Sequence, residues 1–277
     1  MKNRVLLIVL PVAMMQASCV APSGEADGVE DVEEVGHAIV GGSEWPSGWS
    51  PAVHGWLARL SVPGQAVRCG GTLLKSEWVV TAARCVDAFV STPSSVTVTL
   101  GDHDRTRNEG TEVIRRAARI VVHPSWNPST ASSDIALIRL DSPVALGGMI
   151  LGNAIEPPHL SMTWTLYGWG STSASSGPSA VVRQGWMHSP GDPLLDNDVC
   201  ARALGRPLDE TMLCVGPSGT GACNGDEGGP LMRWGGRMPH RLMGIVSWRS
   251  PRCDSYTVFT NAAHFDGWVN SIVGGGV

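Results

Sequence analysis

Short apolar runs separated by clusters of Gly, Pro, Ser and Asn fill the chain from Ile39 onward, and this spacing constrains the fold most strongly. It is typical of strands in an all-β protein. The end of the chain differs, because apolar residues there recur at three- and four-residue steps and predict one amphipathic helix. The pattern permits a β-sandwich or a pair of barrels. The helix residues are Phe265, Trp268, Val269, Ile272 and Val273, and the clearest strand-like runs are 54–62, 77–82, 95–100 and 135–140.

The first 38 residues have the composition of a targeting segment and a leader. Lys2 and Arg4 precede an apolar run and then small residues, the layout of a secretory signal peptide over residues 1–18. The apolar run is too short to span a membrane. Residues 16–19 resemble a bacterial lipoprotein cleavage box, in which lipid attaches to Cys19; the alternative is a plain signal with Cys19 unmodified. Six acidic residues crowd residues 25–34, so we expect a solvated acidic leader over 19–38.

Composition and charge narrow the classes of partner. The 277 residues are 43% hydrophobic, enough to bury one large core or two small ones. The formal net charge of −5 provides no broad basic surface, so we do not expect nucleic acid as a partner. We expect a monomer that uses no cofactor.

Seven cysteines indicate an exported, disulfide-bonded protein. Six remain when Cys19 is set aside, and an even set is what an oxidising compartment favours. Six cysteines allow 15 pairings, so the count alone does not choose among them. No C-x-x-C or H-x-x-x-H spacing supports zinc, and we expect no metal.

Several separated segments resemble the trypsin and chymotrypsin family, in the right order over nearly all of residues 39–277. One resembles the mature N-terminus, two bracket the catalytic histidine, one holds the catalytic aspartate, and others resemble the serine loop and the strand that pairs with substrate. In that order they are Ile39-Val40-Gly41-Gly42, Cys69-Gly70-Gly71-Thr72-Leu73, Thr81-Ala82-Ala83-Arg84-Cys85, Asp134-Ile135-Ala136-Leu137, Gly225-Asp226-Glu227-Gly228-Gly229-Pro230 and Ser247-Trp248; Gly168-Trp169-Gly170 also fits.

The resemblance implies an all-β fold of two six-stranded antiparallel barrels with a C-terminal α-helix. The barrels would occupy roughly 39–150 and 151–277, with the cleft between them. A further family disulfide would join position 164 to 232 or 233, and both halves are missing, since these are Trp164, Met232 and Arg233. The disulfides that it implies are Cys69–Cys85, Cys200–Cys214 and Cys223–Cys253.

The chain departs from the family at two catalytic positions. Asp134 is kept, but Arg84 stands where the family has its histidine and Glu227 where it has its serine. A guanidinium remains protonated and cannot act as a general base, and a carboxylate cannot replace the hydroxyl nucleophile. We expect Arg84 to form a salt-bridged triplet with Asp134 and Glu227; the alternative is that Arg84 and Glu227 point into solvent. The backbone N–H groups of Gly225 and Glu227 would form the oxyanion hole, which the Glu227 carboxylate is expected to occupy.

The resemblance also places a substrate cleft along Ser247 and Trp248. Gly221 lies where trypsin-like enzymes carry an acidic residue, so selectivity for Lys or Arg is not expected. Arg249 and Thr257 stand at positions of pocket-wall glycines and should narrow or plug the pocket.

In the family, cleavage before the mature N-terminus frees an ammonium that pairs with a buried aspartate. The corresponding pair here is Ile39 with Asp226. Ala38 precedes the bond, so either a protease that does not require Lys or Arg cuts it, or the chain stays uncleaved and zymogen-like.

We therefore expect a secreted or lipid-anchored, non-catalytic protease homologue that binds or regulates another protein, with membrane contact only through lipid on Cys19. The enzyme alternative is a serine endopeptidase. A glycosidase-like pair of Asp134 and Glu227 is the weakest reading, because Arg84 between them should keep both ionised.

Overall fold

The structure is a computed structural model, and it describes residues 39–45, 54–152, 163–187, 194–217, 219–234, 240–253 and 256–277. All of these belong to one compact unit, Gly36–Val277. The predicted signal peptide 1–18, the lipid-attachment candidate Cys19, the acidic leader 19–38 and Ala38 lie outside the described residues.

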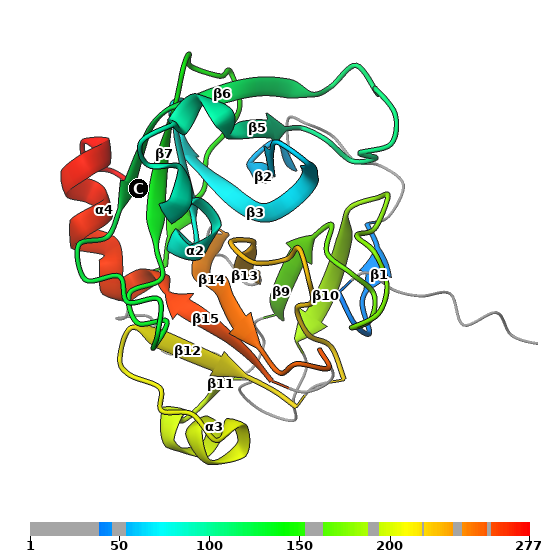
Figure 1. Ribbon diagram of the computed structural model, residues 1–277, viewed down its shortest axis with the longest axis vertical. Coiled ribbons are helices and arrows are strands. Elements are labelled where there is room, and N and C mark those ends of the chain that lie inside the picture. The colour runs from blue at the N-terminus through cyan, green and yellow to red at the C-terminus, as the bar shows by residue number, and fades with distance from the viewer. Residues whose placement is uncertain are drawn as a thin grey trace, which may run out of the picture. The chain divides into compact units, whose positions relative to one another are not determined.

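Six antiparallel strands form a closed barrel in the first half of this unit (Figure 1). They are β2 (Leu57–Val62), β3 (Gln65–Lys75), β4 (Trp78–Thr81), β5 (Thr97–Leu100), β6 (Val113–Val122) and β7 (Ala136–Leu140). The hydrogen-bonded order is β2-β3-β4-β7-β6-β5. Leu57, Leu73, Val98 and Leu137 are fully buried inside it. The first predicted barrel is thus confirmed.

The second half forms a sheet of nine strands. They are β1 (Ser43–Glu44), β8 (Ile150–Leu151), β9 (Thr163–Gly168), β10 (Arg183–Met187), β11 (Leu194–Leu195), β12 (Met212–Val215), β13 (Pro230–Trp234), β14 (Arg241–Arg249) and β15 (Thr257–Asn261). The path is β1-β10-β9-β13-β14-β15-β12-β11, with β8 pairing in parallel to β14. Its six longer strands are consecutive, as expected for the second barrel, but among the described residues the path does not close. Two-residue strands extend it instead.

The beginning of the mature domain belongs to this second sheet and not to the first half. β1 pairs with β10, and Val40 forms a bridge with Gly221. Ile39 is fully buried in the core of the second sheet, in a cluster with Leu166. Residues 39–44, which were predicted to belong to the first barrel, thus pair and pack with the second sheet.

The short helices sit at the edges of the strands. They are α2 (Ala83–Val86), α3 (Asn197–Leu204) and α4 (Asp266–Val273), with 3-10 turns η1 (Asp87–Phe89), η2 (Pro93–Ser95) and η3 (Ala262–Phe265). α4 lies beside β7 (Figure 1), and its Val269 is fully buried in the core cluster of the first barrel. The Lys75 ammonium donates to the Val273 carbonyl at 3.3 Å. The predicted C-terminal helix is confirmed, although its first apolar residue, Phe265, lies in η3. No helix in the described part of the chain is long and apolar enough to cross a membrane.

The three disulfides implied by the family are all present: Cys69–Cys85, Cys200–Cys214 and Cys223–Cys253. The first joins β3 to α2, which carries Arg84. At the position of the missing bridge, Trp164 of β9 lies directly opposite Arg233 of β13. Two large side chains thus occupy the cross-strand position where the family has a disulfide.

We predict that Phe265→Ala lowers the free energy of unfolding by about 3–5 kcal/mol, because truncating a buried aromatic ring leaves a cavity. Phe265 is 3% exposed, and its ring meets that of His123 at 4.9 Å. The control is Gly267→Ala in α4, where an added Cβ has no neighbour within 4 Å. That change should stabilise by about 0.4–1 kcal/mol. Denaturant unfolding measures both, and equal effects would contradict the packing of this segment.

Candidate functional site

Arg84 and Asp134 form an ion pair between the first barrel and the strand β14. Asp134 precedes β7 and is fully buried. The Arg84 Nε donates to Asp134 Oδ2 at 2.5 Å, and the Arg84 backbone N–H donates to Oδ1 at 3.0 Å. Burial raises the pKa of Asp134, while the charge of Arg84 and the hydrogen bonds from Ser247 and Arg84 act against that rise. The predicted pairing of Arg84 with Asp134 is confirmed.

Ser247 completes the environment of this ion pair from the second sheet. Its hydroxyl donates to Asp134 Oδ2 at 2.6 Å, and the Arg84 Nη2 lies 3.4 Å from the same hydroxyl oxygen. The guanidinium also lies 5.7 Å from the centre of the Trp126 ring. Arg84 is therefore held on several sides, and it has no lone pair with which to accept a proton.

Glu227 lies in the tight loop 223–229, which is fixed against the first barrel. The Gly70 N–H donates to the Glu227 carbonyl at 2.7 Å. Gly228 has φ of 78°, and a Cβ there would lie 2.5 Å from the Gly70 carbonyl oxygen, so only glycine fits. The Gly225 N–H donates to Glu227 Oε2 at 2.8 Å. The Glu227 carboxylate thus occupies the N–H group of Gly225, and the role of the Gly225 and Glu227 N–H groups as an oxyanion hole stays a prediction.

The other half of the predicted triplet, an ion pair of Arg84 with Glu227, is wrong. Glu227 pairs with Arg249, whose Nη2 is 3.7 Å from Oε1, and no ion pair joins Glu227 to Arg84 among the residues described. The cause is local: the Glu227 side chain turns back over its own loop to accept the Gly225 N–H. The alternative of two solvated side chains is also not observed, since Arg84 is 29% and Glu227 23% exposed.

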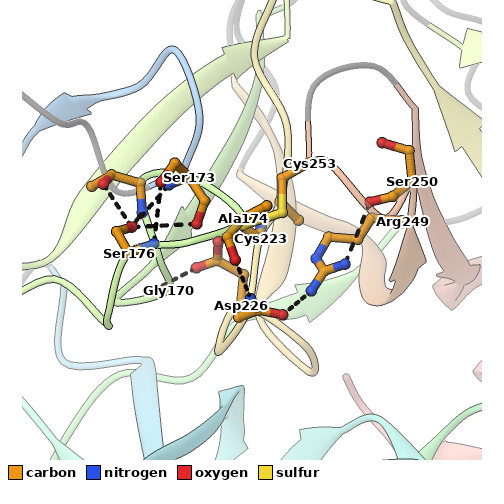
Figure 2. Close-up of a disulfide and its surroundings, with 12 residues drawn as sticks. Gly170, Ser173, Ala174, Ser176, Cys223, Asp226, Arg249, Ser250 and Cys253 are labelled. Carbon is orange, nitrogen blue, oxygen red and sulfur yellow. Dashed lines mark hydrogen bonds between the residues drawn. A yellow bond between two sulfur atoms is a disulfide. The ribbon is translucent and has the colours of Figure 1, made fainter.

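Arg249 and Thr257, the two residues expected to narrow the pocket, contact the segment that follows Gly221. Arg249 reaches from the end of β14 toward the 223–227 loop, beside the Cys223–Cys253 disulfide (Figure 2). Its Nη2 donates to Asn224 Oδ1. Thr257 Oγ1 accepts the Ala222 N–H at 3.0 Å, and it would lie 3.3 Å from a Cβ at Gly221. The Thr257 side chain thus lies next to Gly221, whereas Arg249 contacts Asn224, and the narrowing of the pocket by both residues stays a prediction.

Asp226 is a buried carboxylate without a cation at ion-pair distance among the described residues. Its two oxygens accept the backbone N–H groups of Gly170 and Cys223, each at 2.9 Å. In the continuous chain the nitrogen of Ile39 is an amide and not an ammonium, so the expected ion pair of Ile39 with Asp226 stays a prediction for a cleaved chain. Burial raises the pKa of Asp226 to about 7.

One acidic cluster in the described part of the chain has the spacing of a cation site. The carboxylate oxygens of Asp102, Glu109 and Glu112 lie within 4.8 Å of one another, and oxygen ligands suit Ca²⁺. However, Arg59 pairs with Asp102 at 2.5 Å and Arg107 with Glu109 at 3.1 Å. These guanidiniums offset part of the charge that would hold a cation, and the absence of a metal stays a prediction.

Comparison with known proteins identifies the family. Residues 39–269 match the Trypsin family. The chain is 36% identical over 242 residues to serine protease 56 from Homo sapiens, covering 83% of this chain and 38% of that protein. It is 32% identical over 261 residues to human chymotrypsin-like elastase family member 1, covering 88% of this chain and 95% of the relative, and 30% identical to human kallikrein-15 over 79% of this chain and 86% of the relative. The chain belongs to the trypsin family. It spans well under half of serine protease 56.

Sequence reasoning missed two residues that shape the cleft. Asn224 fixes the Arg249 guanidinium, and Arg206 places its own guanidinium 4.5 Å from the centre of the Trp248 ring. Asn224 adjoins the serine-loop motif, which could have drawn attention to it. Arg206 lies in a loop outside every motif, and nothing in the sequence pairs it with Trp248.

We predict that Arg84→Met lowers the free energy of unfolding by about 3 kcal/mol at neutral pH, because Asp134 would remain buried without a cation. The control is Glu227→Gln. An amide oxygen can still accept the Gly225 N–H, and the ion pair to Arg249 is long and partly exposed, so the loss should stay below about 1 kcal/mol. Denaturant unfolding compares the two variants. A smaller loss for Arg84→Met than for Glu227→Gln would contradict the assigned pairing.

The second prediction for this site concerns pH. A carboxyl whose pKa rises on folding favours the folded state fully below its unfolded pKa, and this contribution is lost as pH rises through the folded pKa. For Asp226 in the intact chain, the loss should extend from about pH 4 to about pH 7. Asp226→Asn should remove this part of the pH dependence.

The readout is the difference in unfolding free energy between variant and wild type at several pH values. Absolute stability is not diagnostic, because the substituted amide places an NH₂ group opposite a backbone N–H. Asp141→Asn, at an exposed position, controls for removing one carboxylate. If the difference between Asp226→Asn and wild type is flat from pH 4 to pH 7, the buried state of Asp226 is misassigned.

Proposed function

We propose that this trypsin-family protein is not a peptidase and acts by binding another protein. The observation that carries the proposal is the ion pair of Arg84 with Asp134, at 2.5 Å, in the place where catalysis needs an imidazole. A serine hydroxyl becomes a nucleophile only when a base within hydrogen-bond reach takes its proton. Here the base position holds a permanent cation, and the nucleophile position holds a carboxylate.

The remaining groups near Asp134 do not restore a base. The hydrogen bonds to its carboxylate come from Arg84 and Ser247. His123 is the histidine closest to Asp134 in the sequence, and its ring packs 4.9 Å from the rings of Phe265 and Trp268. Removing nucleophile and base from such enzymes costs about a million-fold in turnover.

Serine endopeptidase activity is the alternative function, and family membership alone is equally consistent with it. It would require Arg84 to accept a proton, for which a guanidinium has no lone pair, and Glu227 to act as the nucleophile in place of the serine hydroxyl. A glycosidase-like carboxylate pair is disfavoured further by the burial of Asp134, which is fully inaccessible and already bonded.

We propose that the protein binds its partner outside the cell. The three disulfides fit an exported protein, because such bonds persist in oxidising compartments. We propose a monomer that engages a protein or peptide partner, without nucleic acid or a cofactor. Lipid on Cys19 would add a membrane anchor, and the binding function does not depend on it.

We predict that the purified protein is not labelled by a fluorophosphonate serine probe and cuts no member of a broad peptide library. Gel fluorescence and mass spectrometry measure the two outcomes, with active trypsin as the positive control. Labelling or cleavage that persists after repurification would contradict the proposal.

The companion variant combines Arg84→His with Glu227→Ser. It returns an imidazole beside Asp134 and a hydroxyl beside Gly225, so labelling should rise above that of the wild type. Adding Arg249→Gly then tests whether the closed pocket is a further block.

A further inference from the structure

The guanidinium groups of three arginines lie at the end of β14, whose last three residues are Ser247, Trp248 and Arg249. Arg84 Nη2 lies 3.4 Å from the Ser247 hydroxyl oxygen, Arg206 lies 4.5 Å from the centre of the Trp248 ring, and Arg249 follows as the last strand residue. They come from α2, from the loop after α3 and from β14 itself. Segments far apart in the sequence thus converge on one short stretch of strand.

Two of these three arginines are hydrogen-bonded only by neutral acceptors. Arg206 Nη2 donates to the Ser129 carbonyl at 3.1 Å, and Arg249 donates to the Asn224 amide oxygen and the Ser250 carbonyl. Arg206 has no carboxylate at ion-pair distance in the part of the chain described. The ion pair of Arg249 with Glu227 is long, because the two atoms are 3.7 Å apart and thus beyond hydrogen-bond length. Arg84, by contrast, is neutralised by Asp134.

The same stretch has more donors than acceptors. The Nε1 of Trp248 and the Nε of Arg249 are buried and have no hydrogen-bond partner among the described residues. Arg206 stacks on the Trp248 ring, which leaves the edge of its guanidinium available for a carboxylate. Charge and hydrogen-bonding capacity therefore both favour an anionic ligand.

The strand geometry favours a polypeptide as that ligand. β13 pairs with β14 only up to Ile245, whereas β15 pairs with it as far as Arg249. On the β13 side, Val246 is still hydrogen-bonded to Gly228 and Gly229, and beyond Val246 no strand among the described residues pairs with that edge of β14. An extended segment can add to such an edge, and its alternate side chains would then meet the arginines.

We infer that the end of β14 binds an acidic polypeptide segment of a partner protein, through Arg206 and Arg249. This inference rests on the proposed binding function of the cleft and names the chemistry of its partner. Glutamate or aspartate side chains bind the guanidinium edges, while the peptide backbone lies along Trp248. A basic segment is rejected by the same charges.

The test is fluorescence anisotropy with three fluorescein-labelled, end-blocked ten-residue peptides. They share one sequence, except that four positions carry glutamate, glutamine or lysine. The glutamate peptide should bind at least about tenfold more tightly than the glutamine peptide, and added salt should weaken it. Equal affinities for the glutamate and glutamine peptides would overturn the inference.

Two variants localise the site. Arg206→Gln and Arg249→Gln should each weaken the glutamate peptide about tenfold, because each removes a charge-assisted hydrogen bond. The matched control is Arg202→Gln, which removes the same charge from an exposed position on α3 and should leave the affinity unchanged. Equal losses for Arg202→Gln and Arg206→Gln would overturn the assigned surface. Circular dichroism and thermal unfolding confirm that each variant is folded.

Two further readouts separate the outcomes. Mass spectrometry of the binding samples detects cleavage, which would overturn the non-catalytic function and leave the acidic preference in place. Competition with inorganic polyphosphate at equal charge tests the kind of anion. Weaker displacement by polyphosphate than by unlabelled glutamate peptide supports the polypeptide, and stronger displacement overturns it.

Discussion

The Asp134 carboxylate is fully buried where the two halves of the fold meet, and a buried carboxylate must be paired or hydrogen-bonded. It receives contacts from both halves: Arg84 belongs to α2 beside the first barrel, whereas Ser247 lies in β14 of the second sheet. The Thr260 hydroxyl of β15 also donates to the Asp134 carbonyl at 2.7 Å. A chain that keeps this aspartate but lacks the family histidine needs another partner for it, and Arg84 supplies one. The residue that would remove a proton in an active enzyme is here a structural cation.

Once Arg84 serves Asp134, the charges of the cleft divide into two separate groups. Glu227 is free to satisfy the Gly225 N–H and to approach Arg249, and Arg249 in turn bonds to Asn224. Each of these contacts gives a nearby donor an acceptor, or a nearby acceptor a donor. Together they place side chains in the positions of the base, the oxyanion and the specificity pocket. The proposed non-catalytic function rests on this arrangement.

Two kinds of feature could be predicted from the sequence: those that a family motif fixes, and those that the cost of burying an unpaired charge fixes. The disulfide partners follow from the family pattern, and the pairing of Arg84 with Asp134 follows because a buried carboxylate needs a partner. The partner of Glu227 was not predictable, because it depends on how the loop turns a backbone N–H two residues earlier toward the side chain. Arg206 was not predictable for another reason: its contact with Trp248 joins a loop to strand β14 through a stacking interaction that leaves no pattern in the sequence. The open second sheet likewise depends on two-residue strands too short to carry an apolar alternation.

In the continuous chain, the loop around Asp226 is held by contacts that do not require a free ammonium. In the family, a freed ammonium orders this region by pairing with the buried aspartate. Here two backbone N–H groups already bind Asp226, and Ile39 is fully buried although its nitrogen is an amide. Val40 is bridged to Gly221, and the Cys223–Cys253 disulfide and the bonds of Arg249 tie the same loop to the end of β14. An enzyme needs the ammonium because it must switch from an inactive to an active loop. A protein that acts by binding, as proposed, needs only one loop conformation, and these neutral hydrogen bonds and the disulfide help to hold it.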